Sequence, residues 1–520
     1  MMNSGLKIGD WGLKIAKSEY KIGYLGWLRG LLLTILSLFI FTLPIFAQSD
    51  INISGDNSLT YIYRTVKDSL NSYFQNETSV RVDFKNFTFG MTFLAELPKY
   101  DKFEAKEELH PGDLNTEWVD RFVQLRYDDL LVRVGTVEEA YGAGLVLRSF
   151  RDTDLNRDKR LEGARVNYTF ENLKLSGIYG ALREDIGVQG IRKNDLVIGV
   201  DADLKPLDFL ILGASAVQLK QYEMKESRKY THTDIYGGRM NLMFDMFDVS
   251  TEYAHMIQSY NALDSRPGSA FYITTNMYMG IFTLTGSYKN YLRYNNPLAD
   301  LPTLNHYDEL LSSYADLVND TEEGVQGKLV FIPDFDNEFL LDYAESWNKN
   351  FTVRHSNFFG EYKRNFSSLT ASFEYEHLEK IDKNLQTWEQ ELRPAVNIDL
   401  YSMAKPTIVK FLWSITSDES FDSSVFDTIK KSHHKPYLQV DTKFHERLAV
   451  SISAEYEFKD MDDLVKNRVY LGGEIVTSIS QHTDVSLFLG KEKGGKVCRN
   501  GVCQFQAPFE GIKFSLNTRF

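Results

Sequence analysis

The chain is poor in proline, in positive charge and, beyond one N-terminal segment, in long apolar runs. Only 12 of its 520 residues are Pro, which excludes long disordered linkers. A mean hydropathy of −0.31 excludes a membrane protein built from many apolar helices. The formal net charge of −14 argues against nucleic acid as the main partner.

Sequence signals for catalysis are also missing. We find no Gly-x-Ser-x-Gly, no phosphate-binding loop and no His-Glu-x-x-His. His433 and His434 stand beside three lysines in a polar stretch, which is typical of a solvated loop. The sequence therefore predicts no enzyme and no cofactor, although catalytic groups that meet only in space stay open as an alternative.

Residues 31–46 form the one long apolar run, and it carries no charge. A basic region precedes the run, and the small residue Ala47 follows it. This order is typical of a cleaved signal peptide, whereas a spanning helix usually needs ~20 apolar residues. We therefore predict a signal peptide over residues 1–47 and keep an uncleaved anchor as the alternative. Residues 1–47 carry five basic and two acidic residues, so the remaining chain has a charge near −14 − 3 = −17.

Residues 48–520 show period-2 alternation of apolar and polar residues in one segment after another. One example is Phe87, Phe89, Met91 and Phe93, and another is Leu448, Val450 and Ile452. Alternation alone also fits a soluble β-sandwich, but the connections favour a different fold. Short turns near Lys85-Asn86, Asp128-Asp129, Glu171-Asn172 and Lys205-Pro206 alternate with long polar loops such as 98–118, 138–160 and 292–324.

This asymmetry predicts a single all-β domain: a transmembrane antiparallel up-and-down barrel of about 24 strands. Its short turns would be periplasmic and its long loops outside. Abundant Tyr and Phe, 29 and 35 residues, agree with aromatic belts at the membrane surfaces. The expected location is the Gram-negative outer membrane, with outer-membrane lipid as a partner.

The last segment alternates up to the final residue. Phe514, Leu516 and Phe520 lie on one face of it. A terminal aromatic on an alternating strand resembles the sorting signal read by the barrel assembly machinery, which we therefore expect as a partner. An ordinary amphipathic edge strand is the alternative.

Alternation also assigns polar residues to the lumen. A basic wall would come early and an acidic wall later, setting a field across a pore. The alternative is that charges simply avoid lipid. The lumen-lining candidates are Gln124, Arg126, Arg133, Arg165, Lys174, Asp201, Asp203, Arg239, Glu252, Glu374, Glu376, Glu455 and Glu457.

Two further groups suggest local chemistry. Asp152, Asp154, Asn156 and Asp158 resemble the start of a calcium loop, but the later Gly and Glu are absent. We predict a salt-bridged loop and no metal there. Cys498 and Cys503 flank an Asn-Gly turn sequence. In an oxidising periplasm they are expected to form a disulfide.

Residues 133–170 resemble the alginate-export family of outer-membrane porin-type barrels. The matching residues are Arg133-Val134-Gly135, Tyr141-Gly142-Ala143-Gly144 and Leu161-Glu162-Gly163-Ala164-Arg165. An uncharacterised family of outer-membrane barrels of unknown function is the other resemblance. Both imply passive transport and name no solute.

The function expected from these observations is a porin-like conduit for small polar solutes, with oligosaccharides as one class. A structural or assembly-partner barrel with a blocked lumen and protein-binding loops is the alternative. A receptor with a plug domain is disfavoured, because alternation already begins at Ile51 and Ile53. Association into a homo-oligomer is left open.

Overall fold

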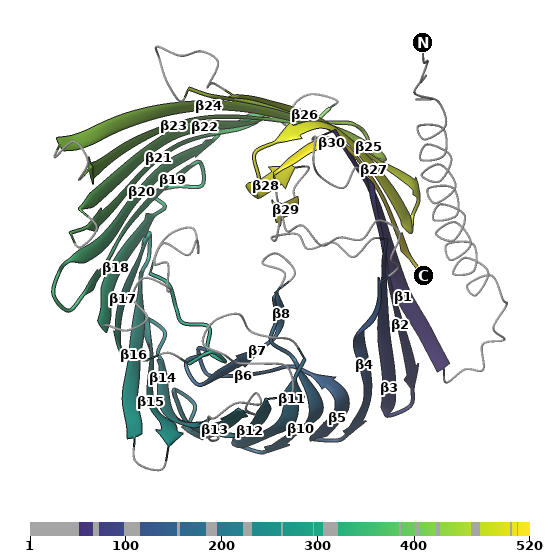
Figure 1. The fold of residues 1–520 in the computed structure, drawn as a ribbon, viewed down its shortest axis with the longest axis vertical. Coiled ribbons are helices and arrows are strands. Elements are labelled where there is room, and N and C mark those ends of the chain that lie inside the picture. Colours follow the sequence, from purple (N-terminus) through teal and green to yellow (C-terminus); the bar gives the residue numbers. More distant parts are fainter. Residues whose placement is uncertain are drawn as a thin grey trace, which may run out of the picture. The chain divides into compact units, whose positions relative to one another are not determined.

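The fold is that of a computed structural model, and its elements are those of an all-β protein (Figure 1). The structure describes residues 51–65, 72–97, 115–152, 157–183, 195–221, 231–261, 264–294, 296–304, 321–383, 386–400, 405–422, 427–458, 468–499, 502–506 and 508–520. The predicted signal peptide, residues 1–47, lies outside these ranges and stays a prediction. No helix in the described part of the chain is long and apolar enough to cross a membrane.

Twenty-four strands form one antiparallel sheet. The first twelve are β1 (Ile51–Arg64), β2 (Ser72–Phe84), β3 (Phe87–Leu97), β4 (Asn115–Tyr127), β5 (Leu130–Val137), β10 (Leu161–Phe170), β11 (Leu173–Leu182), β12 (Leu196–Leu207), β13 (Leu210–Gln221), β14 (Thr231–Met243), β15 (Phe247–Asn261) and β16 (Asp264–Met279). The others are β17 (Phe282–Leu292), β18 (Thr321–Phe331), β19 (Asn337–Asn348), β20 (Val353–Asn365), β21 (Leu369–Asp382), β22 (Thr387–Leu400), β23 (Thr407–Asp422), β24 (Asp427–His445), β25 (Leu448–Glu457), β26 (Arg468–Ser480), β27 (Thr483–Glu492) and β30 (Phe509–Arg519).

The sheet closes on itself. β1 pairs with β2 on one side and with the last strand, β30, on the other. Gly55 and Phe520 exchange two backbone hydrogen bonds at this seam, of 2.9 and 3.0 Å. The predicted antiparallel up-and-down barrel of about 24 strands is thus confirmed.

Tight turns lie close to their predicted places. Lys85, Asp128 and Glu171 adopt left-handed φ values of 44–51° at three of them, a conformation that two-residue hairpins require. The turn predicted at Lys205-Pro206 lies instead at residues 208–209, and Pro206 belongs to β12. Proline lacks an N–H, and the pairing of β12 with β13 shifts register just there, where a strand tolerates proline.

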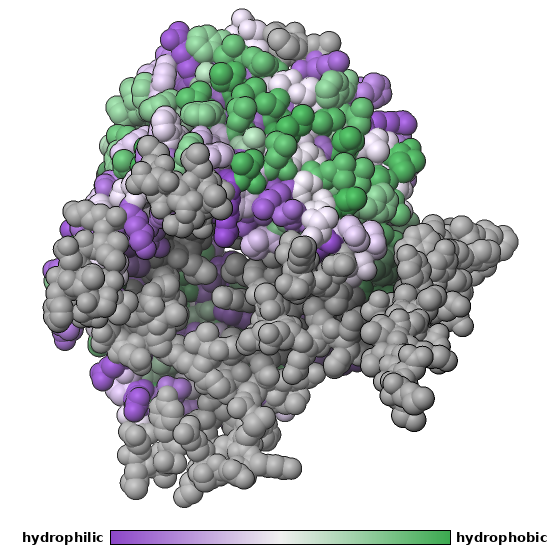
Figure 2. Space-filling model, turned by 45° about the horizontal axis from the view of Figure 1, so that its top comes forward, coloured by the Kyte–Doolittle hydropathy of each residue, from purple (hydrophilic) through white to green (hydrophobic). Residues whose placement is uncertain are grey.

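Successive residues of a strand point to faces of different character. Val200 is 58% exposed while the next residue, Asp201, is 8% exposed, and Ile452 and Ser451 show the same contrast at 56% and 1%. Hydrophobic side chains gather over part of the surface in Figure 2. The outer face is therefore apolar and the inner face mostly polar, as expected for a barrel in lipid.

Six short strands of the described residues lie outside the main sheet: β6 (Glu139–Tyr141), β7 (Leu147–Ser149), β8 (Arg151–Asp152), β9 (Arg157–Asp158), β28 (Gly495–Arg499) and β29 (Val502–Gln506). They form three separate two-stranded sheets. The chain also divides into two compact units, of which the second comprises Phe122–Gly473 and Lys496–Phe505. The site described next lies within this second unit.

Candidate functional site

Part of the long loop after β5 folds back over the inner face of the sheet. Its strands β6 and β7 pair as a hairpin, with Tyr141 opposite Leu147. Gly142 and Gly144 have φ values of +59° and +95° in the connecting turn, a region that glycine enters at little cost. Figure 1 shows β6 and β7 on the inner side of β10 to β14. We call this hairpin (residues 139–149) together with residues 296–304 the inner assembly.

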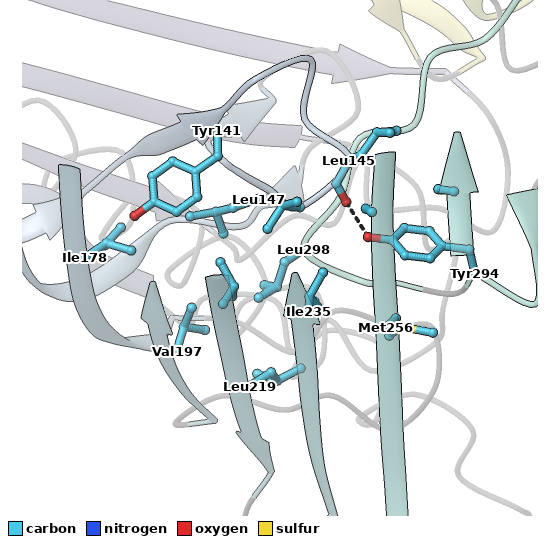
Figure 3. Close-up of a cluster of buried hydrophobic side chains, with 14 of the residues drawn as sticks. Tyr141, Leu145, Leu147, Ile178, Val197, Leu219, Ile235, Met256, Tyr294 and Leu298 are labelled. Atoms are coloured by element: carbon cyan, nitrogen blue, oxygen red, sulfur yellow. Dashed lines mark hydrogen bonds between the residues drawn. The ribbon is translucent and has the colours of Figure 1, made fainter. Parts of the chain in front are cut away.

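The inner assembly is attached to the sheet through an apolar core (Figure 3). Leu145, Val146, Leu147 and Leu298 are fully buried, and each contributes about 1.5–3 kcal/mol of burial free energy. The core residues contributed by the strands and their immediate ends are Val137, Leu161, Ile178, Leu182, Val197, Val217, Leu219, Ile235, Ala254, Met256, Ala270, Tyr291 and Tyr294.

Small residues of the sheet leave room for the larger side chains of the hairpin. A Cβ atom on Gly199 would lie 3.2 Å from the Tyr141 hydroxyl, and one on Gly237 would overlap Val146. Ala254 and Ala270 are also fully buried under the hairpin's core. Interiors pack with few voids, so this surface of the sheet is shaped to receive the hairpin.

The two parts of the inner assembly are hydrogen-bonded to each other. The Arg148 amide donates to the Leu298 carbonyl at 2.7 Å, and the Asp300 amide donates to the Gly144 carbonyl at 3.1 Å. The Asn296 amide group donates to the carbonyls of Leu145 and Val146, both at 2.9 Å. With their backbone groups satisfied in this way, the hairpin and residues 296–304 form one unit.

Charged side chains of β12, β14 and β15 lie next to this core. Arg239 donates to both carboxylate oxygens of Asp201 at 2.7 Å and to Asp203 at 2.5 Å. Gly213 on the intervening strand provides the space, because a Cβ there would overlap the Arg239 side chain. The Glu252 carboxylate accepts from the Ala143 amide at 2.5 Å and from the Leu145 amide. The hairpin is therefore held by both apolar packing and a buried carboxylate.

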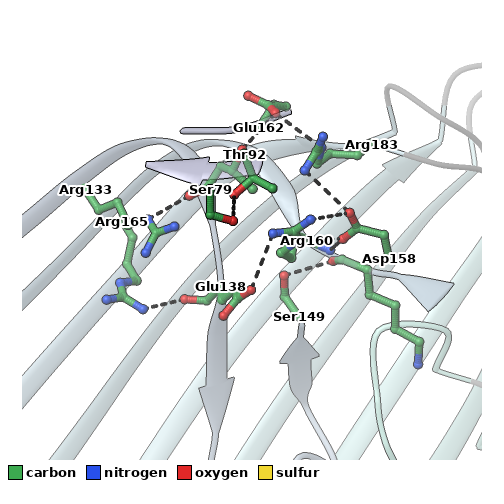
Figure 4. A network of polar contacts seen from close by, with 12 residues as sticks. Ser79, Thr92, Arg133, Glu138, Ser149, Asp158, Arg160, Glu162, Arg165 and Arg183 are labelled. Atoms are coloured by element: carbon green, nitrogen blue, oxygen red, sulfur yellow. Dashed lines mark hydrogen bonds and ion pairs between the residues drawn. The ribbon is translucent and has the colours of Figure 1, made fainter. Parts of the chain in front are cut away.

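A second polar network lies at the base of the hairpin (Figure 4). Arg160 pairs with Asp158 at 2.7 Å and with Glu138 at 3.8 Å, and Arg183 reaches Asp158 at 3.5 Å. Arg165 donates to the Glu138 carbonyl at 2.5 Å. Burial alone would raise the pKa of Asp158, but the hydrogen bonds and charge of Arg160 outweigh it and hold that pKa below its ordinary value.

Tyr141 is the largest fully buried side chain of the hairpin. Its hydroxyl has no hydrogen-bond partner among the residues that the structure describes. Burial, followed by the nearby Glu139 carboxylate, raises the pKa of this hydroxyl. Tyr141 therefore stays neutral at any ordinary pH and acts by filling space.

Five of the lumen-lining candidates lie around the inner assembly. Arg165, Asp201, Asp203, Arg239 and Glu252 make the contacts given above. Gln124 pairs in register with Arg133, whose guanidinium stacks on the Phe122 ring at 3.6 Å. Arg126 and Lys174 are exposed, and Lys174 lies opposite Asp203 in the ladder.

The remaining four candidates lie on two strands, Glu374 and Glu376 on β21 and Glu455 and Glu457 on β25. Glu376 accepts from Asn357 at 2.9 Å and pairs with Arg393 at 3.2 Å, and Glu374 accepts from Asn397. Glu457 accepts from the Tyr470 hydroxyl at 3.5 Å, and Glu455 lies opposite Tyr437 in the ladder. Glu376 and Glu457 are buried.

Two other predicted groups, the Asp152–Asp158 loop and the two cysteines, lie partly outside the residues that the structure describes. Asp154 and Asn156 lie outside the described residues, as does the side chain of Asp152, whereas Asp158 is paired with arginines. Cys498 and Cys503 belong to β28 and β29 of one two-stranded sheet. Their side chains are not described, so the disulfide stays a prediction.

The sorting signal also stays a prediction. Phe514, Leu516 and Phe520 lie in or directly after β30, and Phe514 and Leu516 pair in register with Tyr61 and Leu59 of β1. This placement is at the seam where the sheet closes.

The inner assembly itself was not foreseen as a packed unit. One signal was present in the sequence. On β12 and β13 the inner face is polar in the middle of the strand and apolar where the strand meets a long loop. Asp201 is thus followed on its face by Val197 toward the loop, and Ser215 by Leu219. A wet lumen gives no reason for such residues, so they indicate that something covers them.

Comparison with solved structures shows a fold shared with a chain of a pilus assembly complex. A chain of the E. coli P pilus tip assembly intermediate PapC-PapD-PapK-PapG is similar with a TM-score of 0.53 at 8% identity, over 92% of this chain and 62% of that chain. This protein thus spans less than two thirds of the length of that relative. The siderophore receptor PirA of Pseudomonas aeruginosa gives 0.45 at 8% identity, covering 91% and 81% of the two chains. OccAB1 of Acinetobacter baumannii gives 0.38 at 14% identity, covering 64% and 91%.

Sequence comparison identifies a family. No curated protein sequence matches the chain. A family model matches residues 42–307, just over half of the chain and including the whole inner assembly, and it describes a family of unknown function, DUF6029. It is not that of the alginate-export family, so the resemblance of residues 133–170 stays a prediction. The chain belongs to the DUF6029 family.

Proposed function

We propose that this protein is an outer-membrane conduit for the passive passage of small polar solutes, narrowed on one side by the inner assembly. One observation carries the proposal: the sheet is closed, its outer face is apolar, and its inner face is lined by hydrogen-bonded polar side chains. A lipid-facing outside and a wet inside are what a pore requires.

The aromatic side chains near the short turns support membrane insertion. Phe282, Phe331, Phe339 and Tyr362 stack in sequence across neighbouring strands, with centroid distances of 4.6, 5.7 and 4.6 Å. Phe209 and Phe244 stack similarly at 5.1 Å. Rings in such rows are typical of the level of the lipid headgroups. Export by a signal peptide and insertion by the barrel assembly machinery belong to the same proposal.

The charges favour cations as permeating ions. The chain after residue 47 has a net charge near −17 by the arithmetic above. Arg239 of the basic wall is also neutralised locally, because it pairs with Asp201 and Asp203. A pore with excess carboxylate concentrates cations, and this preference fades as salt screens it over ~3 Å at 1 M.

Reversal potentials in planar bilayers test the proposal. Purified protein under a KCl gradient should give discrete channels that prefer K⁺, with a preference that weakens at high salt. A preference for anions that shifts with Arg133→Gln would favour acidic sugars, as the alginate-export resemblance implies. Silent bilayers with correctly folded protein would contradict the conduit.

The inner assembly also supports the alternative function, a barrel with a blocked lumen whose loops bind another protein. It occupies the inner face of β10–β17 with a dry core, as a lumen-blocking element would. A barrel that never conducts would favour this alternative, in which the outside loops bind another envelope protein.

A further inference from the structure

We propose that Glu252 anchors the inner assembly to the barrel wall and thereby sets the width of the passage. The inference rests on the proposed conduit for its effect on solutes. The anchoring itself can be tested without conduction.

Glu252 is placed to hold the turn of the hairpin. It lies on β15 with 5% of its surface exposed, and its carboxylate accepts hydrogen bonds from the amides of Ala143 and Leu145. These amides point to the carboxylate because Gly142 takes the left-handed conformation just before them. A carboxylate that accepts from two backbone N–H groups of one turn forms stronger hydrogen bonds than a neutral acceptor does.

The neighbouring Arg239 is held mainly by two aspartates. Arg239, which comes close to the same turn, is bound on two sides by Asp201 and Asp203. Arg239 and Glu252 are themselves opposite each other in the ladder of β14 and β15. Arg239 thus links β14 to β12 within the wall, whereas Glu252 links β15 to the hairpin.

Movement of the hairpin would move the rest of the inner assembly. Residues 296–304 are bonded to the hairpin backbone at Gly144, Leu145, Val146 and Arg148. The Tyr294 hydroxyl also donates to the Leu145 carbonyl at 2.8 Å (Figure 3). Through the two amides that it binds, Glu252 would therefore hold the hairpin and residues 296–304 together against the wall.

A designed cross-link reports whether the hairpin is seated. A Cβ on Gly237 would lie 3.7 Å from the Cβ of Val146, close to the ~3.8 Å typical of disulfides. The overlapping Val146 methyl disappears in the pair Val146→Cys and Gly237→Cys. We would make this pair in a Cys498→Ser, Cys503→Ser background and follow oxidation by gel mobility and mass spectrometry.

Three further variants distinguish the loss of the hydrogen bonds to the hairpin from the loss of a negative charge on β15. Glu252→Ala removes the acceptor and should slow cross-linking about tenfold or more, as expected for lost hydrogen bonds to a charged group. Glu252→Gln keeps one acceptor oxygen and should cross-link faster than Glu252→Ala. Asp248→Ala is the matched control: Asp248 lies on the same face of β15 but bonds Asn276 and Tyr278, not the hairpin.

Conductance then links the anchor to the passage. Glu252→Ala should raise the single-channel conductance, and the oxidised cross-link should return it to the wild-type value until it is reduced. Equal cross-linking rates with and without the Glu252→Ala substitution would overturn the anchor, as would slowing by Asp248→Ala to the same extent. If the wild type is silent, the conduit fails, and the cross-linking rates alone decide the anchor.

Discussion

The hairpin fits against the wall because residue 142 is a glycine and has no Cβ atom. Its φ of +59° is strained for other residues, and a Cβ would overlap the Glu252 carboxylate. Gly280 has a similar φ of +64° with nothing within 4 Å of its would-be Cβ. The two positions therefore separate backbone strain from steric overlap.

We predict that Gly142→Ala unseats the hairpin, whereas Gly280→Ala carries only the strain of about 1–2 kcal/mol. Hydrogen–deuterium exchange of residues 139–149 should accelerate in the first variant and stay unchanged in the second. Slow exchange in both would show that the turn adjusts to a methyl group without moving.

Asp158 makes the base of the hairpin sensitive to acid. Its pKa is lower in the folded protein than in the unfolded chain, where an Asp titrates near ~3.9. A lowered pKa adds stability above the unfolded value, and this stability is lost as the pH falls through the folded value. Protonation would remove the carboxylate charge that Arg160 and Arg183 share, and the side chains of these arginines are only 4% and 8% exposed.

We therefore predict that pepsin cleaves near residues 150–160 increasingly as the pH falls below about 4. Asp158→Asn lacks the charge at every pH, so its cleavage should already be high at the upper end of pepsin's range and change less on acidification. A wild-type protein that resists cleavage throughout would contradict the role of Asp158.

At the scale of elements, the inner assembly and the strands depend on different forces. The strands are held by a continuous ladder, whereas the hairpin depends on a few buried side chains. Leu145 is fully buried in this core, so Leu145→Ala should cost about 2–5 kcal/mol. The loss should appear as faster exchange in residues 139–149 and 296–304.

Val200→Ala is the control, because Val200 is an exposed outer-face residue of β12. It should leave exchange in the inner assembly unchanged. Accelerated exchange throughout β10–β17 after Leu145→Ala would mean that the hairpin and the wall do not unfold separately.

Much of the element level could be predicted from the sequence, because alternation and turn residues act locally. The strands around Phe87 and Leu448 and the turn at Asp128-Asp129 are examples. The Pro206 turn was misplaced because a register shift in the ladder accommodates the proline. Loop residues 138–149 could be identified as a Tyr-Gly motif, but their packing depends on Gly199, Gly237 and Glu252, which come from three other strands. Such long-range contacts leave no periodicity in the sequence.

At the scale of the whole molecule, the closed ladder and the inner assembly have separate roles. Closure satisfies every strand edge, which is a condition for crossing lipid. The inner assembly covers the apolar part of the inner face of β10–β17. We therefore expect a passage that admits small polar molecules and limits their size.

Liposome swelling measures whether the barrel passes small polar solutes and where the size limit lies. Vesicles containing the purified protein would be placed in isosmotic solutions of neutral sugars of increasing size. We expect rapid swelling with monosaccharides, slower swelling with disaccharides and a cutoff that moves to larger sugars in Glu252→Ala. Vesicles that hold folded protein, confirmed by its heat-modifiable gel mobility, and yet swell in none of the sugars would contradict the account.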